Sequence, residues 1–308
     1  MATTLPLPLS DPRSAPSARS RRQKSEPFTK GSTIIAVLYA LACIIPFWII
    51  ISSSLTAEST LNRTGFSIFP TPFSLEGYSM IFGGSARVIN AYVSSVAITV
   101  IGTALALSAT SGLAWVISRR ESHWSRPLAI MTYIPMLLTA GLVPFYILVT
   151  QVLQLRNTWW AVILPFVVSP FLVFVQMQFF REIPQAVIDS ARIDGANELR
   201  IFFTIVLPLS KPILAVIGLF YAVTYWNEWF TALLFISDKE LQPLQQVLQI
   251  MIANISSANA IQPTNAAAAP IFQLRMALTV LTMGPILLAY PFVQRFFVKG
   301  LTLGATKG

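Results

Sequence analysis

The chain has 308 residues, of which 55% are hydrophobic and only 11% are charged, and its mean hydropathy is +0.67. Soluble domains carry about 25% charged residues, so the composition excludes an ordinary soluble enzyme and indicates an integral membrane protein. The net charge of +9 does not indicate nucleic-acid binding, because the lysines and arginines gather beside apolar segments and set membrane orientation. The single Cys43 cannot form a disulfide within the chain, and the lone His123 cannot build a metal site by itself.

Residues 1–31 are rich in Pro, Ser and Arg, and we expect them to form a disordered basic tail. The apolar segments that follow can each cross a hydrocarbon core of about 30 Å as a helix. They cover roughly residues 32–54, 89–118, 128–150, 159–180, 205–236 and 277–298. The first is too long for a signal peptide, so we expect it to be retained. Because no alternating barrel strands occur, the sequence predicts an all-α polytopic membrane protein with six transmembrane helices in one domain, residues 32–308.

The distribution of positive charge predicts the orientation of these helices. Sixteen of the 21 lysines and arginines lie in the tail, in the loop 119–126, in the segment 181–211 and at the C-terminus. The positive-inside rule therefore places both termini and the segment 181–211 in the cytoplasm. The connections 55–88 and 237–276 are then expected outside.

The segment from Ile183 to Pro212 is a polar insert that lipid would exclude. It contains four charged residues within ten positions, namely Asp189, Arg192, Asp194 and Glu198. A continuous helix over 183–200 would place four residues on one narrow face, Ile188, Ala191, Gly195 and Leu199. Gly195 could instead mark a turn between two short helices. A plain alternative is an amphipathic connector that lies on the lipid headgroups.

The spacing in this insert resembles the signature loop of ABC importer permeases, E-A-A-x3-G-x9-I-x-L-P. Asp189-Ser190-Ala191 stands in the place of E-A-A, with Asp one methylene shorter than Glu. Three residues then precede Gly195, nine precede Ile205, and Leu207-Pro208 closes the motif. Asp194-Gly195-Ala196 has the form typical of carbohydrate-type members.

Three further stretches resemble the permeases of maltose-type importers. They are Gly65–Tyr78 after the first segment, Tyr225–Phe230 (YWNEWF), and the C-terminal VKGLTLGATKG from Val298. The resemblance covers nearly the whole chain after residue 30 and implies the ABC type I importer permease fold. It also implies a multi-pass protein of a bacterial inner (plasma) membrane.

In that family the signature loop forms a coupling helix that sits in a groove of a cytoplasmic ATPase. The resemblance therefore implies that the motif residues just named couple this chain to an ATPase dimer. It further implies a second homologous permease subunit and an extracytoplasmic sugar-binding protein. No Walker A sequence, paired catalytic carboxylates or metal cluster occurs in the chain, so we expect no enzyme here. ATP and Mg²⁺ would be bound by the partner ATPase, and this chain would carry no cofactor.

The fifth apolar segment ends in a polar cluster with the only acidic residue of any span. Tyr225, Trp226 and Asn227 could line a substrate path, since aromatic faces stack on sugar rings and amides hydrogen-bond hydroxyls, while Glu228 could join the path or pair with a partner subunit. Aromatic and polar residues also favour the membrane interface without any substrate role.

The outer segment 241–255 has apolar residues at helical spacing, which predicts a short helix packed on the outer mouth or contacting the binding protein. The favoured function is the permease subunit of an ATP-driven oligosaccharide importer. A secondary transporter of a small polar solute is the alternative, although that class usually needs ionisable groups within the membrane and internal repeats.

Overall fold

The computed structural model describes residues 27–66, 68–83, 85–119, 121–138, 140–261, 271–285 and 287. Helices are the regular elements of this part of the chain, apart from one isolated antiparallel bridge between Thr56 and Phe73. The expected all-α class is therefore confirmed. The chain divides into two units, residues 1–47 and residues 48–308.

The first apolar segment is the helix α1 (Pro27–Ser54), most of which belongs to the first unit. It begins five residues earlier than predicted, so the expectation of a disordered tail is wrong for residues 27–31. Proline suits a first helical turn because its missing N–H has no partner there. The rest of the predicted tail, residues 1–26, lies outside the described residues. The side chains of 31–48 are exposed and mostly apolar all round the helix, as expected for a helix that contacts lipid or another chain.

The second unit contains the remaining helices. Its first part has α2 (Glu58–Thr64), α3 (Glu76–Gly83), α4 (Ser85–Ser118), α5 (Ser125–Leu137) and α6 (Leu142–Ile147), which continues into the π-helical turn η1 (Leu148–Val152). Next come α7 (Trp160–Ile163), the 3₁₀ turn η2 (Leu164–Phe166), α8 (Pro170–Arg181), α9 (Gln185–Ile193), α10 (Glu198–Ile201) and the π-helical η3 (Phe202–Val206). The last elements are α11 (Leu207–Leu209), α12 (Lys211–Asn227), α13 (Phe230–Phe235), α14 (Leu244–Ile261) and a helix over 271–285.

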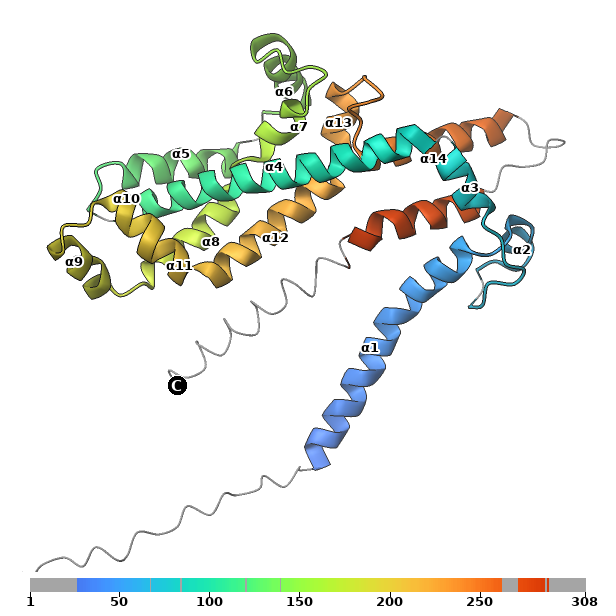
Figure 1. The fold of residues 1–308 in the computed structure, drawn as a ribbon, viewed down its shortest axis with the longest axis horizontal. Coiled ribbons are helices and arrows are strands. Elements are labelled where there is room, and N and C mark those ends of the chain that lie inside the picture. The colour runs from blue at the N-terminus through green and yellow to red at the C-terminus, as the bar shows by residue number, and fades with distance from the viewer. Residues whose placement is uncertain are drawn as a thin grey trace, which may run out of the picture. The chain divides into compact units, whose positions relative to one another are not determined.

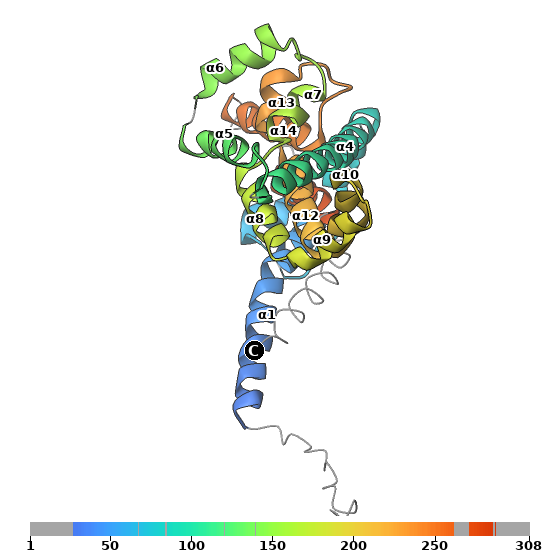
Figure 2. The ribbon, with the colours of Figure 1, turned by 90° about the vertical axis from the view of Figure 1, so that its left-hand side faces the viewer.

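Helix α4 is the axis on which the second unit packs. It lies against α12 and α8 along its length, and it also contacts α5 and α14 (Figure 1). Three apolar clusters follow one another along α4, around Ala114 and Trp115, around Ile98 and Ala106, and around Val88 and Ala91. Figure 1 shows α9 and α10 at one end of α4, and α3 and α14 at the other, and Figure 2 looks onto the end with α9 and α10.

Two helical stretches, Gly31–Ser54 and Arg87–Ser118, are each long and apolar enough to cross a membrane. They match the first two predicted spans. Two bent helix pairs raise the number to four if each pair forms one span. These are Trp160–Phe166 with Pro170–Arg181, bent by 49°, and Glu198–Leu209 with Lys211–Asn227, bent by 83°.

Several predicted spans are interrupted where a single helix was expected. The third is divided between α5 and α6, the fourth is broken before Pro170, and the fifth is broken at Ser210 and again before Phe230. Prolines explain part of this, because Pro170 and Pro212 lie at helix N-termini, where a missing N–H costs nothing. The helix of the sixth span begins at residue 271 instead of 277, and its part beyond residue 287 lies outside the described residues, as does the C-terminal stretch from Val298.

The helix predicted over the outer segment 241–255 is α14. Leu244 and Leu248 are buried in the cluster around Val88 and Ala91, and Met251 packs on its edge. The packing role is therefore confirmed for these residues.

Candidate coupling site

The polar insert folds as two short helices joined by a tight turn. α9 ends at Ile193, and α10 begins at Glu198. The expectation of one continuous helix over 183–200 is thus wrong, and the alternative of a turn at Gly195 is confirmed. The physical reason is the positive φ of +79° at Gly195, which a continuing right-handed helix does not allow and which glycine adopts without steric cost.

The turn is a Schellman motif, which closes a helix with two backbone hydrogen bonds. The N–H of Ala196 donates to the carbonyl of Ala191 at 2.9 Å, and the N–H of Gly195 donates to the carbonyl of Arg192 at 3.0 Å. These bonds satisfy carbonyls that the end of α9 would otherwise leave unpaired. The Asp194-Gly195-Ala196 part of the motif is therefore explained locally, since the second position must be left-handed.

The second short helix begins with a side-chain cap. The Oδ1 of Asn197 accepts a hydrogen bond from the N–H of Arg200 at 2.8 Å, as a good N-cap residue does. The chain then passes through the π-helical η3 and the short α11, and turns by 83° across Ser210 into α12. Pro208 lies in the first turn of α11, where its missing N–H leaves no bond unmade.

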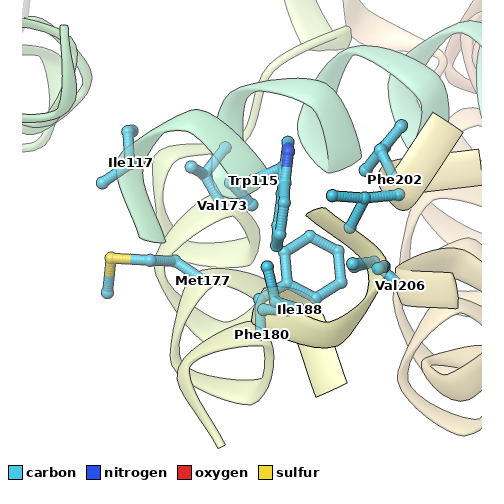
Figure 3. Packing of buried hydrophobic residues seen from close by; sticks show 11 residues of the cluster. Trp115, Ile117, Val173, Met177, Phe180, Ile188, Phe202 and Val206 are labelled. Atoms are coloured by element: carbon cyan, nitrogen blue, oxygen red, sulfur yellow. The ribbon is translucent and has the colours of Figure 1, made fainter. Parts of the chain in front are cut away.

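One side of this double helix is anchored in the core of the unit. Ile188 and Ala191 from α9 are buried together with Ile201, Phe202 and Val206. They pack against a set of side chains from α4 and α8, namely Ala114, Trp115, Ile117, Val173, Met177 and Phe180, most of which Figure 3 labels. A continuous helix was predicted to place Ile188 and Ala191 on one face with Gly195 and Leu199. That grouping is wrong, because the turn sends α10 in a new direction.

Trp115 is the centre of this anchor. Its ring centroid lies 6.1 Å from that of Phe180, nearly edge-on, and 6.1 Å from that of Phe202. Both are favourable separations for aromatic pairs. Figure 3 shows the Trp115 ring beside the side chains of Phe180 and Phe202, with Ile188 nearby. The anchor therefore joins α4, α8, α9 and η3.

The other side of the double helix is open. Ile193 is 86% exposed and Leu199 is 69% exposed, and Asp194 and Gly195 between them are exposed as well. A Cβ built on Gly195 would meet nothing within 4 Å. Large apolar side chains on a polar, otherwise well-anchored turn indicate a contact surface for another molecule.

Asp189 makes its contacts within the chain, in spite of its short side chain. Its Oδ1 accepts a hydrogen bond from the Nε2 of Gln185 at 2.9 Å and lies 3.6 Å from the Nη1 of Arg192. The neighbouring Ser190 donates its hydroxyl to the carbonyl of Ala186 and is exposed. Asp189 therefore stiffens α9 in addition to any contact it makes outside the chain.

Arg192 binds three carboxylates at the mouth of the turn. Its Nη2 and Nε donate to Oε1 of Glu198 at 2.6 and 3.0 Å, and its Nη1 donates to Oε2 of Glu121 at 3.3 Å. Asp189 is the third. The hydrogen bonds that Arg192 donates to Glu198, followed by the negative charge of Glu198 and the contacts with Glu121, raise the pKa of the Arg192 guanidinium above its ordinary value. Arg192 is charged at any physiological pH.

The last motif residues lie at the border of the anchor. Ile205 and Leu207 are half-buried and pack against the cluster around Trp115, and Pro208 is exposed. The structure therefore brings all nine predicted coupling residues into one contiguous region at the end of α4. The buried and half-buried motif residues fix the shape of the region, and the exposed motif residues form its surface.

The second predicted group, at the end of α12, is arranged differently. Tyr225 and Trp226 are only 2% and 6% exposed. The hydroxyl of Tyr225 donates to the carbonyl of Ile163 at 3.0 Å, and the indole N–H of Trp226 donates to the carbonyl of Thr282 at 3.0 Å. Both rings are covered by this chain itself, so the structure leaves no ring face open for stacking on a sugar.

The other two residues of that group lie where α12 ends. Asn227 is exposed, and its amide donates to the carbonyl of Val223 at 2.9 Å and accepts from the Nε2 of Gln245 at 3.3 Å. Glu228 accepts from the N–H of Thr231 at 2.8 Å, which caps the start of α13. Of the predicted group, Asn227 has the side chain most available to a solute.

Sequence reasoning missed three residues that build the coupling region, Trp115, Arg119 and Glu121. They come from the end of α4 and the loop after it, about seventy residues from the motif. The Arg119 guanidinium lies 5.0 Å from the centroid of the Trp115 ring. The only signal in the sequence is the positive charge of the loop 119–126, which by itself indicates membrane orientation and no contact with the motif.

The described residues contain no group of three or more His, Cys, Asp or Glu side chains that could hold a metal ion. The exposed Ile193 and Leu199 and the carboxylates around Arg192 offer docking and ion pairing.

Comparison with known proteins identifies the class that this fold and region define. A family described as "Binding-protein-dependent transport system inner membrane component" matches residues 102–303. The chain is 39% identical over 274 residues to the polygalacturonan/rhamnogalacturonan transport system permease protein YtcP of Bacillus subtilis, covering 88% of this chain and 95% of the relative. It is 30% identical over 283 residues to the melibiose/raffinose/stachyose import permease protein MelC of the same organism, covering 90% and 96%.

A solved structure shares the fold. It is a chain from the crystal structure of a bacterial ABC transporter involved in the import of the acidic polysaccharide alginate, with a TM-score of 0.74 and 24% identity over 88% of this chain and 96% of that one. The protein is accordingly a membrane permease subunit of an importer. It belongs to the family of binding-protein-dependent transport system inner membrane components.

Proposed function

We propose that this chain is the permease subunit of an ATP-driven, binding-protein-dependent importer of oligosaccharides. The support is the family to which the chain belongs, together with relatives named for the transport of galacturonans, raffinose-type sugars and arabinooligosaccharides. The relative with the highest identity of these is named for uronic-acid polymers, so oligogalacturonides are the first substrates to test.

We further propose that the segment 181–211 is the coupling site, with the nine motif residues in that role. The observation that carries this proposal is the anchored turn, because Gly195 and Ile193 project from a double helix whose inner side is fixed by Trp115. A stiff projection of this kind can transmit a push, whereas a loose connector on lipid headgroups cannot.

The proposed partner at this site is a cytoplasmic ATPase dimer, which would bind ATP and Mg²⁺. A second homologous permease subunit and an extracytoplasmic sugar-binding protein complete the assembly in the proposal. Both termini and the segment 181–211 would then lie in the cytoplasm, in agreement with the distribution of lysine and arginine. The ATPase must hold the turn differently in its two states, since only differential binding shifts a conformational equilibrium.

On the substrate side, we propose that Asn227 faces the path, and that Glu228 holds the start of α13. Tyr225 and Trp226 support the path from behind by fixing the end of α12 to Ile163 and Thr282. In this proposal the rings of Tyr225 and Trp226 do not stack on the sugar, because both rings are buried.

The importer assignment is tested by uptake in a strain whose gene for this chain is deleted. Labelled oligogalacturonides, stachyose and arabino-oligosaccharides are each supplied with and without a plasmid-borne copy. We expect one class of oligosaccharide to be taken up only with the copy present. Equal uptake of all three classes in both strains would contradict the assignment.

The energy source of uptake distinguishes the ATP-driven importer from the alternative, a secondary transporter. In right-side-out vesicles that are loaded with ATP and supplied from outside with the binding protein, uptake should survive an uncoupler that collapses the proton gradient. Uptake that is lost with the gradient and is indifferent to ATP would favour the alternative.

A further inference from the structure

We infer that Arg192 is a positioning residue that ties the coupling turn to the loop after α4 through Glu121. This inference rests on the proposed coupling role of the segment 181–211. It concerns how movement of the turn reaches α4, the helix on which the whole second unit packs.

Five side chains form a closed polar ring at this place. Arg192 contacts Glu121 at 3.3 Å and Asp189 at 3.6 Å. Asp189 accepts from Gln185 at 2.9 Å, and Gln185 in turn accepts from Nη1 of Arg119 at 3.3 Å. The ring closes between Arg119 and Glu121 at 3.8 Å. Two of its members thus come from the loop after α4, and three come from α9.

The geometry of Arg192 suits it for this position better than a lysine would. Its Nε and Nη2 hold Glu198 beyond the turn, while Nη1 is left to reach Glu121. A guanidinium donates in several fixed directions from one plane, whereas an ammonium is a single compact charge. One arginine therefore clamps both sides of the turn and also ties the clamp to the neighbouring loop.

Two cavities border the ring, so apolar packing does not fill this contact. One of about 690 Å³ is lined by Gly112, Arg192, Leu199 and Phe203, among others. The second, of about 320 Å³, is lined by residues that include Phe180, Gln185 and Ile188. Both cavities border Trp115, Arg119 and Glu121. Because space remains on either side, the turn and the loop could shift relative to one another unless the ring holds them.

The ring is expected to contribute little to the stability of the fold. The side chain of Glu121 is 70% exposed and that of Arg192 is 35% exposed, and exposed ion pairs are individually weak. Its role is to keep the turn and the loop in one register during a movement. Loss of the ring should consequently reduce coupling before it reduces the amount of protein.

The test is a double-mutant cycle in the complete importer in its native membrane, with labelled oligogalacturonide as the probe. We expect Glu121→Gln to lower uptake about threefold and Arg192→Gln about tenfold, since Arg192 also loses Glu198. If both act through one bond, the double variant should match Arg192→Gln within about twofold. If the loss of uptake in the double variant equals the product of the two single losses, the inference is overturned. Glu240→Gln is the matched control, because Glu240 is exposed, lies outside the segment 181–211 and forms no ion pair within the described part of the chain.

A second readout separates positioning from folding. With the variants present at the wild-type level, ATP hydrolysed per sugar taken up should rise for Glu121→Gln and should stay at the wild-type ratio for Glu121→Asp, which keeps the charge. An unchanged ratio in Glu121→Gln would overturn the inference. Gly195→Arg, measured in parallel, tests the coupling role itself, so a failure of the proposed function can be told from a failure of the ring.

Discussion

The two polar regions that the sequence singled out use their residues in opposite ways. In the coupling turn, the motif glycine and the adjoining Ile193 face outward, and the apolar partners of the motif lie inside. At the end of α12, the two aromatic residues face inward and leave Asn227 exposed. The comparison teaches that a polar-aromatic motif in a membrane helix can be a packing device, while an apolar side chain in a polar insert can be the contact.

The largest effect on uptake is expected at Gly195, on the exposed side of the coupling turn. Gly195→Arg should lower uptake by about a hundredfold or more while the protein stays in the membrane at its normal level, because arginine is strained at φ +79° and fills the space where a partner is expected. Uptake and the amount of membrane-inserted protein are measured together. Gly195→Asn is the control, since asparagine tolerates the left-handed conformation and should retain most of the uptake. Normal uptake by Gly195→Arg would remove the basis for a coupling role.

At the end of α12, the expected effect is on stability. Trp226→Ala should destabilise the protein by about 3–5 kcal/mol, because it leaves a large cavity in the cluster shared with α14. The loss is read as a lower Tm of the purified protein in detergent. Trp226→Phe should lose much less, since it keeps most of the ring volume. If Trp226→Ala loses uptake but keeps its Tm, the ring would instead be assigned to the substrate path.

The contact of α4 with α12 gives a smaller effect at Gly102. A Cβ on this glycine would lie 2.8 Å from the ring of Tyr225. Gly102→Ala should therefore lower stability by about 1–3 kcal/mol through overpacking. In the double variant with Tyr225→Leu, the loss in Tm should be smaller than the sum of the two single losses, because the smaller side chain makes room for the added methyl group. Additive losses in the double variant would show that the ring and the glycine are not in contact.

A modest effect on transport is expected at Asn227. Asn227→Ala should reduce uptake about twofold to tenfold without a change in Tm, as expected for one lost hydrogen bond to a solute. The companion change Gln245→Ala removes its neighbour within the chain. If Asn227→Ala lowers Tm as much as Gln245→Ala and leaves uptake unchanged, the residue belongs to packing alone.

The smallest effect concerns pH and salt at the coupling turn. The pKa of Arg192 is raised in the folded protein, so its stabilisation is present below the ordinary arginine pKa and is lost only at higher pH, as the pH passes the raised value. The contribution of Arg192, measured as the difference in Tm between the wild type and Arg192→Gln, should stay constant between pH 6 and 9. It should shrink when salt is raised, because exposed ion pairs are screened. A contribution that varies with pH in that range would show that another group titrates there.

Much of the fold could be predicted from the sequence because lipid imposes long apolar helices. The first two spans and α14 were found in this way. The breaks at Ser210 and before Pro170 were harder, since a hydropathy pattern continues through a bend that neighbouring helices stabilise. The direction of α10 could not be read from a helical projection, since a single left-handed residue, Gly195, redirects everything after it.

The coupling motif itself was found by spacing, but its support was not. Trp115 and Glu121 lie far away in the sequence and carry no motif, so only folding brings them to the turn. Burial likewise could not be inferred for Tyr225 and Trp226, because an aromatic residue near the membrane edge can face lipid, a path or the core.

The most direct test of the central claim is a photo-cross-linking amino acid placed at Ile193 in the full chain in its native membrane, with the captured molecule identified by mass spectrometry. Leu75 is an equally suitable exposed position in the connection that is expected outside. We expect the probe at Ile193 to capture an ABC-type ATPase and the probe at Leu75 not to do so. Capture of lipid alone at Ile193, as for a connector on the headgroups, would contradict the claim.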